Sequence, residues 1–196
     1  MSRSAKIDRS TRETHITLEL NLDGSNQSKI QTGIGFFDHL LDAFQRHGGF
    51  DLSITCKGDL YIDGHHTVED VGIVLGQAFA GAVGEGRGIT RFGHAYCPLD
   101  ESLARTVVDV SGRPFLFFNC PLALKRVGEF EGELFEEFLR AYTMNARITL
   151  HVELLRGTNQ HHALEAMMKS LARALKMALQ QDKNKKDIPS TKGALL

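Results

Sequence analysis

The stretch DGHHTVED at residues 63–70 decides the fold, because its arrangement of two adjacent histidines and a following glutamate occurs twice in the chain. The second copy is NQHHALEA at residues 159–166, in which His161 and Glu165 correspond to His65 and Glu69. One pair of adjacent histidines arises easily by chance. A second pair with a glutamate at the same offset indicates an internal duplication.

The residues upstream of the two histidine pairs support the duplication. FFDHLL at 36–41 aligns with LFEEFL at 134–139, and this alignment places His39 on Glu137. We therefore predict two successive repeats with the same elements in the same order.

Apolar periodicity predicts that order. In the first repeat, the alternation from Thr14 to Leu22 is that of a half-buried strand, and DGSN at 23–26 predicts a turn into a hairpin. Helical spacing follows at 36–44 and 68–82, with a strand at 50–56 between them. The second repeat reads as strands at 103–112, 114–119 and 147–154 and helices at 133–142 and 164–178. Both repeats are therefore predicted to be α/β (α+β).

The domain organisation follows from the repeat and from the composition. We predict a first α/β repeat at residues 1–93 and a second at 94–196, with a boundary near Gly93 that has no linker composition. With 196 residues, 42% of them hydrophobic, the two repeats are expected to share one core in a single compact domain.

Charge and cysteine content narrow the class of function. The formal net charge is -1, from 23 basic and 24 acidic residues, and this balance favours neither nucleic acid nor an anionic membrane as a partner. The three cysteines have no paired spacing, so we expect thiols in a reducing compartment. No window offers the roughly 18 apolar residues of a membrane span. We expect a cytoplasmic protein with a small ligand.

The duplicated motif predicts two metal sites. The first histidine of each pair shares a helix face with the glutamate four residues later, so the two can bind one ion. His66 and His162 are rotated by about 100° around the helix axis, and we predict that each serves the ion of the other repeat. The equivalent positions one helix upstream supply a fourth ligand. The predicted sets are His39, His66, His161 and Glu165 for one ion, and His65, Glu69, Glu137 and His162 for the other.

This ligand set indicates catalysis. Four nitrogen and oxygen ligands leave open positions on an octahedral ion, as a catalytic centre requires. Ligand type alone leaves manganese, iron and zinc open. A dinuclear metallohydrolase, similar to a phosphatase, would use the same ligands to activate a water. A non-catalytic assembly protein would use them only to join subunits.

The order of several motifs identifies a family resemblance. TGIGFFDHLL, DGHHTVEDVGI, GITRFG, PLDESLAR, DVSGRP, TLHVELLRGTNQHHALEA and PSTKG resemble imidazoleglycerol-phosphate dehydratase of histidine biosynthesis, from about Arg12 to Leu196. The resemblance implies two similar halves, each a four-stranded sheet with two helices on one face, and helices packed between the two sheets. It also implies a homo-oligomer of 24 subunits with octahedral symmetry and two manganese ions per active site at subunit interfaces.

The resemblance further implies a reaction and a set of contacts. The reaction removes water from imidazole glycerol phosphate to give imidazole acetol phosphate. The candidates for proton transfer are Glu13 and the ligand carboxylates Glu69 and Glu165. The family's metal ligands fall on seven of the predicted ligands, all except Glu137. Its substrate contacts fall on Glu13, Arg91, Arg113, Lys169, Ser190, Thr191 and Lys192.

Two features depart from simple expectation. Many members of this family have a histidine ligand where this sequence has Glu137. The repeat aligns Glu137 with His39, so we favour substitution of the ligand, with Glu136 as the alternative.

The C-terminal IPSTKGALL has the composition of a frayed terminus. The resemblance instead implies that its hydroxyls and Lys192 bind the substrate phosphate.

Overall fold

The computed structural model describes residues 3–182 and 187–195. Within these residues, two four-stranded sheets and four helices follow one another in the same order twice. The first half contains β1 (Ser4–Ser10), β2 (Thr14–Asn21), β3 (Ser28–Gln31), α1 (Gly35–Gly48), β4 (Asp51–Gly58) and α2 (His65–Val83). The second contains β5 (Phe92–Leu99), β6 (Ser102–Asp109), β7 (Phe115–Asn119), α3 (Leu134–Ala146), β8 (Thr149–Arg156) and α4 (Gln160–Ala178).

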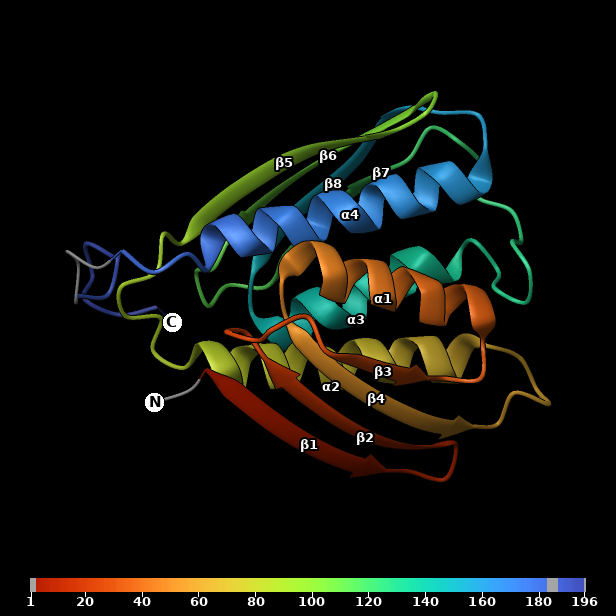
Figure 1. Ribbon diagram of the computed structural model, residues 1–196, viewed down its shortest axis with the longest axis horizontal. Coiled ribbons are helices and arrows are strands. Elements are labelled where there is room, and N and C mark those ends of the chain that lie inside the picture. Colours follow the sequence, from red (N-terminus) through yellow and green to blue (C-terminus); the bar gives the residue numbers. More distant parts are fainter. Residues whose placement is uncertain (1–2, 183–186, 196) are drawn as a thin grey trace.

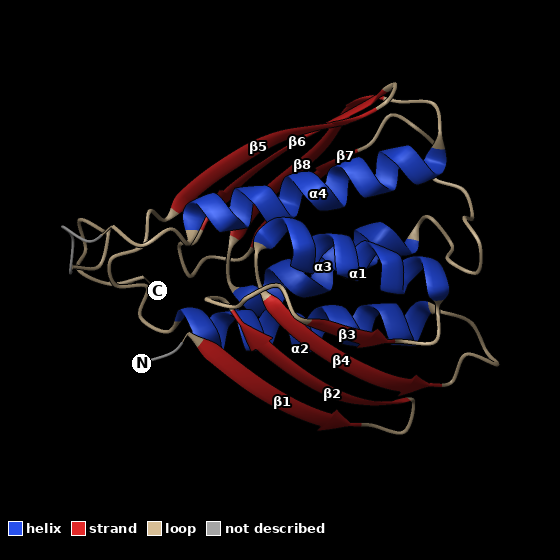
Figure 2. Ribbon diagram, in the orientation of Figure 1, coloured by secondary structure: helices blue, strands red, loops and turns tan. Residues whose placement is uncertain are grey.

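The helices form the inner layers between the two sheets (Figure 1, Figure 2), and the predicted fold class is confirmed. α2 packs on β1 and β2, and α4 packs on β5 and β6. Between them, α1 of the first half packs against α4 of the second, while α3 of the second packs against α2 of the first. The first helix of each half therefore packs against the second helix of the other half. The second sheet begins at Phe92, next to the predicted boundary, and the domain division itself stays a prediction.

The strand order corrects one prediction. The sheets have the orders β1-β2-β4-β3 and β5-β6-β8-β7, with the third strand of each half parallel to the fourth. The turn at 23–26 therefore does not close the expected hairpin, because β3 pairs with β4 and not with β2. The hairpin partner of β2 is β1, an edge strand whose few apolar residues gave no periodic signal.

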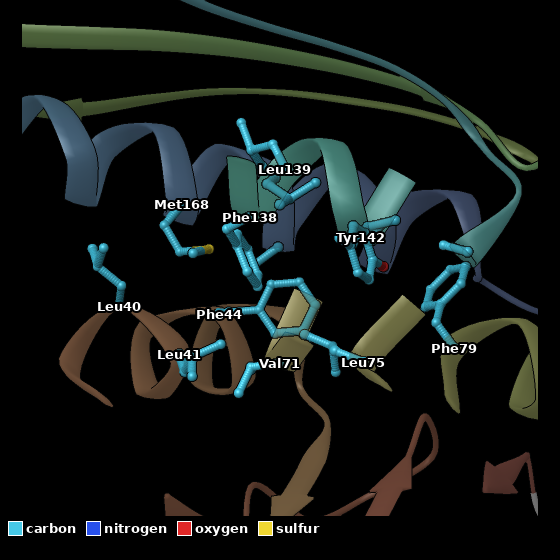
Figure 3. Packing of buried hydrophobic residues seen from close by; sticks show 14 of the residues in the cluster. Leu40, Leu41, Phe44, Val71, Leu75, Phe79, Phe138, Leu139, Tyr142 and Met168 are labelled. Atoms are coloured by element: carbon cyan, nitrogen blue, oxygen red, sulfur yellow. The ribbon is translucent and has the colours of Figure 1, made fainter. Parts of the chain in front are cut away.

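Aliphatic and aromatic side chains from both halves fill the space between the helices (Figure 3). Tyr142 of α3 packs edge-on against Phe44 of α1 and Phe79 of α2, with ring centroids 6.1 Å and 5.8 Å away. All three side chains are almost completely buried. One contiguous core therefore includes both halves.

The outer faces of the two sheets differ in chemistry. One row across the first sheet contains Lys6, Glu19, Ser53 and Lys29, and the equivalent row of the second contains His94, Val107, His151 and Phe117. The second sheet also exposes more than half of Phe92, Tyr96 and Phe115. We call this surface the aromatic face. No described helix is long and apolar enough to cross a membrane.

Glycines on α2 allow its close contact with α3. A Cβ added at Gly76 would lie 2.6 Å from the carbonyl oxygen of Tyr142 and 2.8 Å from the amide nitrogen of Ala146. One turn earlier, a Cβ at Gly72 would lie 2.9 Å from the Phe138 carbonyl oxygen. These neighbours are backbone atoms, which cannot move without shifting the helix.

We predict that Gly76→Ala lowers the thermal unfolding midpoint, although glycine to alanine in a helix normally stabilises by about 1 kcal/mol. The overlap with α3 costs about 1–3 kcal/mol and outweighs that gain. Gly81→Ala on the same helix is the matched control, because its Cβ meets only Ala5 at 3.5 Å. Thermal melting of the two variants checks the prediction. An equal or higher midpoint for Gly76→Ala would show that the two helices are not in tight contact.

Candidate active site

Three predicted metal ligands from the two halves meet in the chain. His39 on α1 and His161 on α4 direct their Nε2 atoms at the same oxygen of Glu165, at 3.2 Å and 3.1 Å. The potential ligand atoms of these residues all lie within 4.8 Å of one another. We call these three residues the first ligand group. It is the one such group of three or more in the described residues.

Local structure holds the first ligand group in place. Asn159 caps α4 with its side-chain oxygen, which accepts hydrogen bonds from the backbone N–H groups of His161 and His162. Lys169, one turn after Glu165, donates to the second carboxylate oxygen at 2.5 Å. Burial by itself raises the pKa of Glu165, but the hydrogen bonds from Lys169 and His39 outweigh it and bring that pKa to about 2. The carboxylate is therefore ionised near neutral pH and able to ligate a cation.

The equivalent residues of the other half lie further apart. His65 Nε2 is 3.8 Å from Glu69 on the same helix. His65 and Glu137 line one pocket of about 380 Å³, together with Glu136. Glu136 accepts a hydrogen bond from Arg140 at 2.7 Å, whereas the closest approach of Glu137 to Arg140 is 3.9 Å. Glu137 is therefore the carboxylate that is more available beside His65.

His66 and His162, the second histidines of the pairs, do not join either group within one chain. The Nδ1 atom of His66 lies 3.0 Å from Asp59, and that of His162 lies 2.8 Å from Glu101. These hydrogen bonds raise the pKa of both histidines. Sequence analysis missed both carboxylates, because neither has a fixed spacing from its histidine. Glu13, a predicted proton-transfer residue, lies 3.7 Å from His66 Nε2.

Two of the predicted substrate contacts, Arg91 and Arg113, lie near the opposite end of α4. The Arg91 guanidinium donates hydrogen bonds to Asp109 at 2.7 Å and to the Pro189 carbonyl oxygen at 2.8 Å. The backbone N–H of Arg91 donates to the carbonyl oxygen of Ala178. Arg113 lies 3.5 Å from the same aspartate. Ser190, Thr191 and Lys192 follow Pro189 in the described tail. With a rise of 1.5 Å per residue, the length of α4 puts roughly 20–25 Å between Ala178, which contacts Arg91, and the two α4 residues of the first ligand group.

The donor set fits a divalent first-row ion. Imidazole nitrogens and carboxylate oxygens without thiolates suit manganese, iron or zinc. The first ligand group presents nitrogen and oxygen from α1 and α4, and His65 of α2 and Glu137 of α3 bring nitrogen and oxygen to one pocket. Lys169 is the one predicted substrate contact that touches the first ligand group within the chain, through its contact with Glu165.

The chain is similar to known proteins over its whole length. The family model for imidazoleglycerol-phosphate dehydratase matches residues 32–175. Two relatives with that name, from Gluconobacter oxydans and Thermoanaerobacter pseudethanolicus, are 56% and 58% identical, over 99% and 98% of this chain and 98% and 100% of theirs.

Solved structures agree. The dehydratase structure from Staphylococcus aureus superposes with a TM-score of 0.83 at 42% identity, covering 91% of this chain and 99% of the other. The structure from Pyrococcus furiosus, in complex with (S)-C348, gives 0.83 at 34% identity over 96% and 100%. With the fold, the paired histidine motifs and these similarities in agreement, the chain belongs to the imidazoleglycerol-phosphate dehydratase family.

Proposed function

We propose that this chain dehydrates imidazole glycerol phosphate to imidazole acetol phosphate in histidine biosynthesis, with two manganese ions per active site. Membership of the family carries the reaction and its class, a hydro-lyase. The observation that supports metal dependence is the first ligand group, in which helices of both halves direct two imidazoles at one ionised carboxylate.

The metal would supply electrophilic power. Bound ions would act as Lewis acids that stabilise negative charge on the substrate's imidazole and so favour loss of the neighbouring hydroxyl. The proposed holders are His39, His161 and Glu165 for one ion and His65, Glu69 and Glu137 for the other, with His66 and His162 completing the sets.

The other polar residues act on protons and phosphate. Glu13 and the carboxylates Glu69 and Glu165 are the proposed proton-transfer groups. Lys169 keeps Glu165 ionised and is close enough to the site to contact an anionic substrate. Arg91, Arg113, Ser190, Thr191 and Lys192 offer guanidinium, hydroxyl and ammonium donors to a phosphate.

Homo-oligomerisation completes this proposal. Within one chain, the proposed phosphate contacts, Arg91, Arg113 and residues 190–192, are far from the first ligand group. A second copy of the chain is therefore needed to bring such contacts close to that group. The aromatic face supports assembly, because a large exposed apolar patch is typical of an interaction surface. Its charged residues Arg105 and Glu153 pair with each other, so the face carries little excess charge and suits a like protein surface. We propose a 24-subunit octahedral assembly in the cytoplasm.

The decisive assay separates dehydration from hydrolysis. Chelator-treated protein is expected to be inactive on imidazole glycerol phosphate, and manganese is expected to restore formation of the acetol product. Turnover by metal-free protein would contradict the metal-dependent proposal. Release of inorganic phosphate in place of the acetol product would favour the metallohydrolase.

We predict that Glu137→Gln weakens one manganese site, because it removes the carboxylate beside His65 that Arg140 holds least tightly. Glu136→Gln is the matched control and is expected to keep both sites. Manganese titration of the metal-free variants distinguishes them, and Glu137→His is expected to retain binding. A selective loss in Glu136→Gln would mean that the repeat is aligned one residue out of place.

We predict that Val107→Glu disrupts the assembly, since it puts a charge into the centre of the aromatic face. Thr17→Glu makes the same kind of change on the polar face of the first sheet and is expected to leave the mass unchanged. Light scattering measures the mass of both variants. An unchanged mass for Val107→Glu would exclude the aromatic face as a subunit contact.

A further inference from the structure

We propose that Asp59 and Glu101 are positioning residues that fix the tautomers of His66 and His162, so that each histidine presents an unprotonated Nε2 to a metal ion. The proposal rests on the proposed metal-dependent function. It adds two carboxylates that are not ligands themselves and that act through the imidazole rings.

Asp59 determines where the proton of His66 lies. Both carboxylate oxygens approach Nδ1, at 3.2 Å and 3.0 Å. An ionised carboxylate only accepts hydrogen bonds, so the neutral imidazole must carry its proton on Nδ1 and its lone pair on Nε2. The nearest carboxylate to Nε2 is Glu13 at 3.7 Å, which is beyond hydrogen-bond distance. The second nitrogen therefore remains available.

Glu101 does the same for His162. Its Oε2 accepts from Nδ1 at 2.8 Å, and the nearest carboxylate to Nε2 is Asp100 at 3.9 Å. The other oxygen, Oε1, is committed to the loop before α4, where it accepts from the backbone N–H groups of Thr158 at 3.1 Å and Asn159 at 2.8 Å. The Ser102 hydroxyl donates to the same oxygen at 3.0 Å. The orientation of the Glu101 carboxylate is therefore fixed from both sides.

The two carboxylates come from different places in the repeat. Asp59 follows β4, whereas Glu101 immediately precedes β6. The residue that precedes β2, the equivalent strand of the first half, is Glu13. The two histidines thus obtain the same Nδ1 partner from positions that duplication alone would not make alike. A carboxylate on the far nitrogen of a metal-binding histidine is the usual way to fix its tautomer and orientation.

The chain offers a pair of substitutions with opposite expectations. In Glu101→Gln, the three donors around Oε1 keep the amide oxygen, so the amide NH₂ must face His162 Nδ1. That donor shifts the imidazole proton to Nε2, where it blocks metal binding. Among residues 3–182 and 187–195, the Asp59 carboxylate forms hydrogen bonds only with His66, so in Asp59→Asn the amide can turn its oxygen to His66 Nδ1 and preserve the tautomer.

The first measurement is the tautomer in metal-free protein, read from the ¹⁵N chemical shifts of labelled histidines at about pH 9, where imidazoles are neutral. We expect Nδ1-protonated His66 and His162 in the unmodified chain and an Nε2-protonated His162 in Glu101→Gln. Finding Nε2-protonated rings in the unmodified chain, or no change in the variant, would overturn the proposal.

The second measurement is manganese affinity by titration of metal-free protein. Glu101→Gln and Asp59→Ala are expected to lose about 10- to 100-fold at one site, and Asp59→Asn is expected to recover most of the loss seen with alanine. If Asp59→Asn lowered manganese affinity as much as Asp59→Ala, the charge of Asp59 and not the tautomer of His66 would matter, and the proposal would be overturned. Failure of the unmodified chain to bind manganese at all would instead defeat the proposed function, while the tautomer measurement would still judge the positioning roles.

Discussion

The packing of helices across the two halves is the constraint on which the site depends. α1 packs against α4 of the second half while it still contacts β3 of its own sheet, and α3 packs against α2 in the same way. This crossing buries apolar faces from both halves in one core and brings His39 to Glu165, which is 126 residues away in the sequence. Without this packing, His161 and Glu165 of α4 would have no ligand partner from the first half. The close approach of α2 and α3 at Gly72 and Gly76 belongs to the same arrangement.

Sequence reasoning predicted the elements with strong periodicity. The alternation of β2 and the helical spacing of α1 and α4 reflect burial of one face, so the pattern is visible without the fold. The edge strand β1 was missed because four of its seven residues are exposed and the other three are only partly buried. The hairpin after β2 was wrong because turn residues fix a change of direction but not the strand that the chain joins next.

The site divides in the same way. Duplication aligned His39 with Glu137 and paired each first histidine with its glutamate, because helical spacing and repeat alignment are local information. Local spacing could not predict the roles of Asp59 and Glu101. Their contacts with His66 and His162 depend on how loops return to the N-termini of the helices. The separation of Arg91 from the first ligand group was equally invisible, because the resemblance names contacts without saying which copy of the chain supplies them.

Divergence between the halves is as informative as their similarity. The fold kept the same strand order twice, yet the outer face became polar on the first sheet and aromatic on the second. One predicted ligand position holds His39 in the first half and Glu137 in the second. In the assembly that we propose, these differences give the two sheets distinct roles.

The number of manganese ions held tightly per chain tests the central claim most directly. Protein reconstituted with manganese and freed of excess metal by gel filtration can be measured by elemental analysis. The account predicts two ions per chain, because each half contributes one duplicated histidine and glutamate motif to a metal site. A value of one would show that only the first ligand group binds metal, and a value of zero would contradict the metal-dependent account altogether.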